Sequence, residues 1–376
     1  MKENGMTCRV FRSSNFELLR IVAMIMIVGY HLANHGVINM LSDKAYNIYS
    51  TGTTVNKWAT SFWGIGGEVG VALFFIITGY FYVKKDKLSL LKIVLEVVFY
   101  GFLCTSLAII IKLFGGNIGF DIFSLLKSLF LPVTAGVWWF VTAYVFLMFM
   151  TPLINLYARS INRKGFFALL IIFWLFEYSL ANFCGTIYYE LQKAIFFYLI
   201  GAFCRLHLRK IKKSNNKKWL LIFFFACWGM GTIVCFFFGQ YSICCNNILR
   251  QKVILKLLSE LKTAVIVPAC AFLLFRYFES LNMRYNKLVN DIASTTFGVY
   301  LLHDSPALRN HIWNEILQVN KIWFFHRTFP IELIIMLLLV FSVCSAIDYG
   351  RIKLIEPFLI KKTKKIMTKL KLEWRN

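Results

Sequence analysis

Long runs of apolar residues, separated by short polar segments, repeat along nearly the whole chain. Each run is roughly 17–24 residues long, enough for an α-helix to cross about 30 Å of hydrocarbon. The pattern predicts an all-α, polytopic integral membrane protein without a separate water-soluble domain between its spans. A further segment, 120–132, is a candidate for a re-entrant dip into the bilayer. The ten predicted spans are 17–38, 66–83, 91–112, 136–156, 165–183, 191–206, 218–239, 261–278, 292–312 and 331–348.

The basic residues predict how these spans are oriented. Most of the 42 Lys and Arg residues lie in connections that alternate along the chain, and these include both terminal segments. Since cytoplasmic loops carry the excess of Lys and Arg, we predict that both termini are cytoplasmic. We divide the chain into one transmembrane domain, 1–350, and a basic cytoplasmic tail, 351–376. We expect no cleavable signal peptide, because the first apolar run is too long and lacks a small-residue cleavage site.

Composition narrows the class of protein. Hydrophobic residues make up 59% of the chain and charged residues only 16%, whereas a soluble globular protein has about 45–50% apolar residues. A soluble enzyme and a disordered chain are both excluded. The net charge of +24 would suggest a nucleic-acid partner in a soluble protein. Here juxtamembrane cations attracted to anionic lipid headgroups account for most of it, so the bilayer is the expected partner and nucleic acid is not.

The first span carries two ionisable side chains on one face. Arg20 and His31 are eleven positions apart, which is about three turns plus 20° and about 16 Å along a helix axis. Ionisable groups within spans are costly and therefore indicate function. Two simpler interpretations stay open: Arg20 as a boundary cation that extends toward the headgroups, and His31 as an interhelical hydrogen-bonding group.

His35 follows His31 by four positions, which is the spacing of a two-histidine metal face on a helix. No third ligand is evident in the sequence, and the neighbouring Glu of the zinc-helix motif is absent. We therefore expect no bound metal.

Other polar and aromatic residues are predicted at the outer ends of later spans. They are Glu68, Trp138, Trp139, His303 and Asp304. Each has an alternative interpretation. Glu68 is an anion of the kind favoured at a helix N-terminus. The two tryptophans belong to an interfacial belt, and His303 with Asp304 is an interfacial polar pair. None of these spacings alone proves catalysis.

Four separated segments of the chain together resemble the membrane acyltransferase-3 family. They are Arg20 with His31, then Gly70-Val-Ala-Leu-Phe-Phe-Ile-Ile-Thr-Gly79-Tyr, then Trp138-Trp-Phe-Val-Thr-Ala-Tyr144 through Thr151-Pro-Leu-Ile-Asn155, and Thr296-Phe-Gly-Val-Tyr-Leu-Leu-His303-Asp304. The chain is especially similar to members associated with bacterial capsular and exopolysaccharide decoration. It departs from the commonest pattern at Thr78, where Ser is frequent, and we expect no appended extracytoplasmic esterase-like domain.

The resemblance implies an acyltransferase of the bacterial cytoplasmic membrane. Its usual reaction moves an acetyl group from acetyl-CoA to a hydroxyl, occasionally an amine, of a surface glycan or its lipid-linked precursor. The Arg and His of the family fall on Arg20 and His31, with the histidine essential to transfer. No bound cofactor is expected, since acyl-CoA is the donor substrate.

The chemistry of acyl transfer assigns roles to these residues. A neutral imidazole suits a general base near pH 7, so we predict His31 as base or transient acyl carrier, with Glu68 orienting its ring. Arg20 would bind donor phosphates, because a guanidinium stays charged and pairs with phosphate in a bidentate fashion. The residues predicted to bind substrate are His35, Trp138, Trp139, Tyr144, His303 and Asp304.

Three other functions compete with this prediction. A transporter or flippase for an anionic or lipid-linked sugar would also use buried Arg, His and Glu, and it would move substrate without consuming acyl-CoA. A glycan polymerase would call for an external loop larger than the roughly 20–27 residues that our predicted boundaries leave. A structural scaffold would leave the outer polar groups without a purpose.

Overall fold

The computed structural model describes residues 13–38, 52–85, 90–116, 123, 126–127, 133, 138–179, 189–208, 214–244 and 248–369. All regular secondary structure in these residues is helical, which confirms the predicted all-α class. Most of the predicted re-entrant segment, 120–132, lies outside them.

Eleven of the helices have thirteen residues or more. They are α1 (Ser14–His31), α4 (Gly66–Tyr82), α5 (Leu91–Leu113), α7 (Trp139–Ser160), α8 (Arg163–Ser179), α10 (Tyr189–His207), α11 (Ser214–Cys244), α12 (Ile248–Glu260), α13 (Val267–Ser280), α16 (Phe329–Leu354) and α17 (Glu356–Lys369). The shorter elements are η1 (Leu32–Val37), α3 (Thr54–Trp63), η2 (Leu261–Ile266), α14 (Lys287–Ser294), α15 (Thr296–His303), η3 (His311–Ile316) and η4 (Trp323–Phe325).

Among the described residues, seven helical segments are long and apolar enough to cross a membrane. They match seven of the predicted spans and make the chain a multi-pass membrane protein. Two further predicted spans, 165–183 and 191–206, correspond to α8 and α10. The total of ten spans and the cytoplasmic placement of both termini stay predictions.

The predicted span 292–312 differs from the structure, because no single helix covers it. Helix α14 ends at Ser294 and α15 begins at Thr296. Between them, the Thr295 hydroxyl bonds to the Ile292 carbonyl and to the Ser345 hydroxyl of α16. Helix α15 then ends at His303, two residues before a Ser-Pro pair that disfavours helical backbone. The consequence is that His303 and Asp304 lie at a helix end inside the protein.

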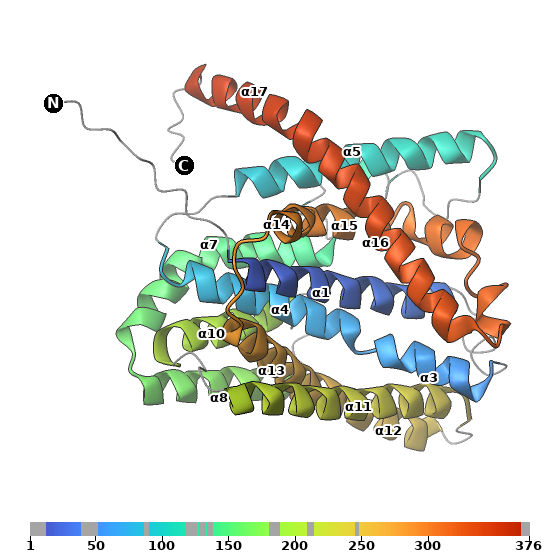
Figure 1. The fold of residues 1–376 in the computed structure, drawn as a ribbon, viewed down its shortest axis with the longest axis horizontal. Coiled ribbons are helices and arrows are strands. Elements are labelled where there is room, and N and C mark those ends of the chain that lie inside the picture. Colours follow the sequence, from blue (N-terminus) through green and yellow to red (C-terminus); the bar gives the residue numbers. More distant parts are fainter. Residues whose placement is uncertain are drawn as a thin grey trace.

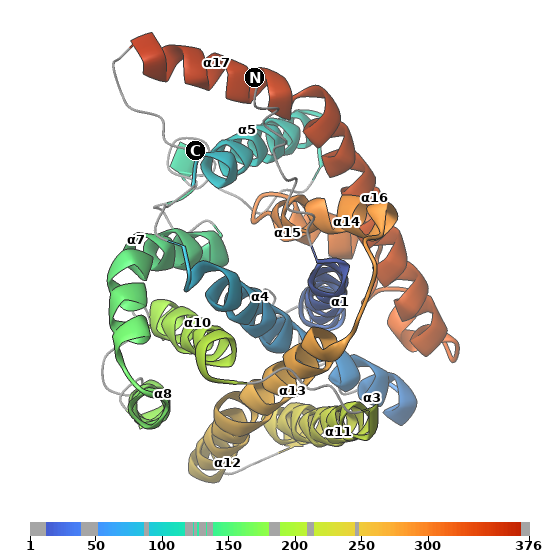
Figure 2. The ribbon, with the colours of Figure 1, turned by 60° about the vertical axis from the view of Figure 1, so that its left-hand side comes forward.

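Helix α1 is the central element of the bundle. Figure 2 shows it nearly end-on, surrounded by α4, α13, α14 and α16, and all four pack against it. Helix α4 also packs against α10, and in Figure 1 these two helices run side by side along the long axis. The shared helix α4 therefore connects the α1 group to the α7, α8 and α10 group.

Glycines allow α4 to approach both neighbours closely. Gly66 and Gly70 face the backbone carbonyls of Met26 and Ala23 in α1, so a Cβ atom at either position would press on that backbone. Gly79 meets the backbone of α10 in the same way, and Gly201 of α10 meets the backbone of α4. Small residues at such contacts are typical of packed membrane helices.

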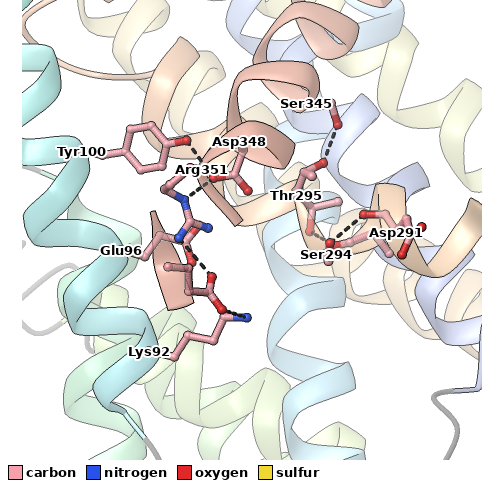
Figure 3. A network of polar contacts seen from close by, with 12 residues as sticks. Lys92, Glu96, Tyr100, Asp291, Ser294, Thr295, Ser345, Asp348 and Arg351 are labelled. Atoms are coloured by element: carbon pink, nitrogen blue, oxygen red, sulfur yellow. Dashed lines mark hydrogen bonds and ion pairs between the residues drawn. The ribbon is translucent and has the colours of Figure 1, made fainter. Parts of the chain in front are cut away.

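A buried charged network joins α5, α16 and α17 (Figure 3). Arg351 of α16 lies 2.5 Å from Asp348 and 2.9 Å from Glu96 of α5, and its guanidinium also pairs with Glu356 at 3.1 Å. The Tyr100 hydroxyl donates to Asp348 at 2.7 Å. Because several partners share the guanidinium, its burial is compensated and α16 is fixed against α5.

Candidate active site

Three histidines and one aspartate from different elements meet at the end of α1. His31 is the last residue of α1, His35 lies one turn on in η1, and His303 with Asp304 ends α15. His31 and His303 are buried, with Nδ1 of His31 2.8 Å from Nε2 of His303. The break between α14 and α15 and the helix end at His303 bring together residues 272 positions apart in sequence.

The hydrogen bonds of this pair determine which nitrogens carry hydrogen. Nδ1 of His303 lies 2.6 Å from the Val299 carbonyl oxygen, which only accepts, so Nδ1 is the donor. With both rings neutral, Nε2 of His303 then accepts from Nδ1 of His31. The hydrogen of His31 is on Nδ1, and its Nε2 carries a free lone pair.

Asp304 provides the negative charge of this group. Its carboxylate lies 3.8 Å from Nε2 of His31, 3.7 Å from Nε2 of His35 and 3.7 Å from the Arg309 guanidinium. These distances are too long for hydrogen bonds, and Oδ1 of Asp304 has no hydrogen-bond partner among the described residues. The carboxylate can therefore stabilise positive charge on either imidazole without occupying the lone pair of His31.

His31 lines a cavity of about 220 Å³. Its polar wall combines His31 with Glu68 of α4 and with Glu190 and Lys193 of α10. Trp139 of α7 adds an aromatic face. The cavity thus has an imidazole, an ammonium group and carboxylates within a helical bundle, where unpaired charge is costly.

Glu68 lies in the wall of the His31 cavity, but its carboxylate pairs with Lys262 of η2 at 2.8 Å. In the described part of the chain, the groups against the ring nitrogens of His31 are His303 and Asp304. The geometry therefore gives the ring-orienting position to His303, and the predicted orienting role of Glu68 stays a prediction without a direct contact.

Arg20 lines a second and larger cavity of about 410 Å³. Its guanidinium bonds to Glu17 at 2.9 Å and 3.2 Å, and its side chain is about 29% exposed. Lys92, Glu96 and Tyr144 also line this cavity.

The two cavities adjoin along one face of α1. Ile27, Val71 and Tyr300 line both of them. Arg20 and His31 therefore line two neighbouring cavities and lie about 16 Å apart along the helix.

The predicted aromatic residues are divided among three places. Trp139 lines the His31 cavity, and Tyr144 lines the Arg20 cavity with its ring stacked near Phe75. Trp138 is only 1% exposed and lies outside the walls of both cavities, where it packs in the core. The structure thus brings Trp139 and Tyr144, but not Trp138, to the walls of these cavities.

Sequence reasoning missed several charged residues of the site. Lys193, Lys262 and Arg309 lie within predicted spans, so the cost of charge in lipid was a signal available for each. What the sequence did not contain was their depth relative to Glu68 and Asp304, which depends on how α10, η2 and the turn after α15 pack.

The described part of the chain is a helical bundle with seven candidate spans and two adjoining cavities, which defines a multi-pass membrane protein. A family model described as an acyltransferase domain matches residues 13–349, so the chain belongs to the membrane acyltransferase-3 family. This match confirms the resemblance found in the sequence. No curated protein and no solved structure matches the chain.

Proposed function

We propose that this protein transfers an acyl group, acetyl in the first instance, from acyl-CoA to a hydroxyl of a bacterial cell-surface polysaccharide or its lipid-linked precursor. One observation carries the proposal: His31 lines a cavity that adjoins the cavity of Arg20. In the proposed reaction, an acyl thioester whose phosphates stay near Arg20 would reach His31 across the boundary that the two cavities share.

The Arg20 cavity suits the donor. Its guanidinium is permanently charged, and Lys92 supplies a second cation on the same wall. Phosphates would compete with the carboxylates that now pair with these groups, Glu17 for Arg20 and Glu356 for Lys92. In the proposed orientation this end faces the cytosol, where acyl-CoA is found.

In the proposed reaction, Nε2 of His31 takes the proton of the acceptor hydroxyl as the oxygen attacks the thioester carbonyl. The tetrahedral oxyanion collapses, the C–S bond breaks, and the thiolate leaves with the proton from the imidazolium. Asp304, 3.8 Å from Nε2, stabilises the imidazolium in between. The same lone pair would serve if His31 instead carried the acyl group transiently.

Lys193 is the cation of the His31 cavity. A positive charge fixed beside the reacting carbonyl would stabilise the oxyanion, which is commonly a large contribution to acyl transfer. Trp139 offers an aromatic face to the acceptor sugar in the same cavity. Acceptor binding by His35 and Asp304 is part of the same proposal, whereas the contact of His303 with Nδ1 of His31 supports a role in positioning that ring.

The test compares His31→Ala and Arg20→Ala with two exposed controls, His326→Ala and Arg327→Ala. Membranes are incubated with labelled acetyl-CoA and candidate glycans, and O-acetyl content is measured by NMR. We expect His31→Ala to lower kcat by about 10²–10⁴, because general acid–base catalysis contributes that much. Arg20→Ala should mainly raise the KM for acetyl-CoA.

Normal acetylation in both variants, at normal protein levels, would remove these assignments. A transporter or flippase is the second candidate, because two neighbouring cavities along α1 also suit a substrate path. Movement of a lipid-linked sugar across liposomes by the purified protein, with no acyl-CoA consumed, would favour that function.

A further inference from the structure

We propose that His31, His35 and Asp304 form a Zn²⁺ site, and that zinc bound there prevents His31 from acting as a base. The metal binding is independent of the proposed function, and only the inhibition rests on it.

The ligand atoms already converge on one point. One ligand atom from each of the three residues lies within 4.8 Å of the other two. Nε2 of His31 is 3.8 Å from Oδ2 of Asp304, and Nε2 of His35 is 3.7 Å from Oδ1. Ligands about 2.0–2.2 Å from a tetrahedral Zn²⁺ are roughly 3.3–3.5 Å apart, so ligand atoms that now lie within 4.8 Å of one another need to approach by about 1.5 Å at most.

The protonation of the site also suits a metal. The bond chain through His303 keeps the hydrogen of His31 on Nδ1, which leaves Nε2 free to ligate. That His303 contact is the partner that an imidazole ligand uses to orient its ring. Oδ1 of Asp304 is buried and has no hydrogen-bond partner among the residues that the structure describes.

The donor set selects the kind of ion. Two imidazoles and one carboxylate, with a fourth position open, are typical of zinc, whereas Ca²⁺ and Mg²⁺ prefer oxygen ligands. The Arg309 guanidinium lies 3.7 Å from Oδ1 of Asp304. A carboxylate has two oxygens, so Asp304 can ligate the metal with one and face Arg309 with the other.

Zinc binding and the proposed reaction use the same atom, Nε2 of His31. The lone pair that ligates the metal is the lone pair that would take the acceptor proton. Zinc binding and general-base catalysis by His31 are therefore mutually exclusive.

The binding test uses the full chain, purified in detergent, stripped with a chelator and titrated with Zn²⁺ against a competing fluorescent chelator. We expect about one zinc per chain. His35→Ala and Asp304→Asn should each weaken binding at least about tenfold, since each removes one of three ligands. His326→Ala is the matched control, because it removes an exposed imidazole beside Glu332, and it should not change the affinity.

Gel filtration establishes that the variants are folded. If a variant does not fold, Co²⁺ added to the wild-type chain decides the question, because tetrahedral His and carboxylate ligation gives an intense visible absorption. Equal zinc affinity in wild type and both ligand variants, or an octahedral cobalt spectrum, would overturn the site.

The inhibition is measured in the labelled acetyl-CoA assay. We expect Zn²⁺ to inhibit transfer by the wild type and a chelator to restore it. Stimulation of transfer by Zn²⁺ would overturn the proposal that bound zinc prevents His31 from acting as a base. If no transfer occurs even without zinc, the proposed function has failed, while the titration still decides whether the metal site exists.

Discussion

At the scale of single residues, the structure places the predicted His31 at the end of a chain of hydrogen-bonded groups. The Val299 carbonyl, His303 and His31 are joined by bonds of 2.6 Å and 2.8 Å. A backbone oxygen thus determines, through a second ring, which nitrogen of His31 is basic. This geometry supports a positioning role for His303, whereas the sequence predicted a role for it in substrate binding.

The variant His303→Gln tests this positioning role. Its amide bonds differently to the Val299 carbonyl and to His31, so the tautomer of His31 is no longer fixed. We expect kcat to fall by about 10–10²-fold, part of what general-base catalysis contributes, with little change in the KM for acetyl-CoA. Steady-state kinetics with acetyl-CoA varied measures both values.

His326→Gln is the control for the His303 variant, because His326 is exposed. If the His303→Gln substitution changes KM but leaves kcat as in the wild type, His303 contacts substrate and does not position His31.

The sequence identified Arg20 and His31 because their spacing belongs to one helix, and helical geometry relates residues on the same element. The pairing of His31 with His303 was not predictable in this way, since it joins elements 272 residues apart. The same limit applies to the metal. The sequence predicted no bound metal because no third ligand was evident beside His31 and His35. Asp304 supplies that ligand only after α15 has packed against α1.

At the scale of elements, α4 determines how the site is assembled, because it packs against both α1 and α10. Its glycines make both contacts close, and the cavity residues Glu68 and Lys193 come from these facing helices. The long apolar helices were predictable from hydrophobicity and length. The break at Thr295 was not, since it depends on a side-chain bond to Ser345 of α16.

A pair of glycine substitutions tests the close packing of α4. At Gly79 a Cβ atom would press on the backbone of α10, whereas at Gly229 of α11 it would meet nothing within 4 Å. We expect Gly79→Ala to lower the free energy of unfolding by about 1–3 kcal/mol, the usual cost of overpacking. Gly229→Ala should leave it unchanged or slightly higher, because alanine favours the helix.

Thermal unfolding of both glycine variants in the same detergent measures the difference. Equal midpoints for the two proteins would mean that α10 shifts to accommodate the methyl group, and close packing would no longer explain Gly79.

At the scale of the whole molecule, each of the two neighbouring cavities is lined by distant parts of the chain. The Arg20 cavity is bounded by α5, α14 and α15, and the His31 cavity by α10 and η2. The Arg351 network fixes α16 against α5 and includes Glu96, which lines the Arg20 cavity. A donor bound between α1 and α5 therefore contacts a wall that the C-terminal helices stabilise.

In the proposed reaction, the boundary between the two cavities is the point that the thioester must pass. Val71 of α4 lines both cavities, and a tryptophan there would fill the space between them. We expect Val71→Trp to abolish transfer while acyl-CoA still binds at the Arg20 end, as measured by equilibrium binding of labelled acyl-CoA alongside the transfer assay.

Val98→Trp on α5 is the matched control, because Val98 is 46% exposed on the outer surface of the bundle. It should retain both binding and transfer. Full turnover by Val71→Trp would mean that the acyl group reaches the acceptor by another route, and that Arg20 and His31 do not act on one substrate within a single space.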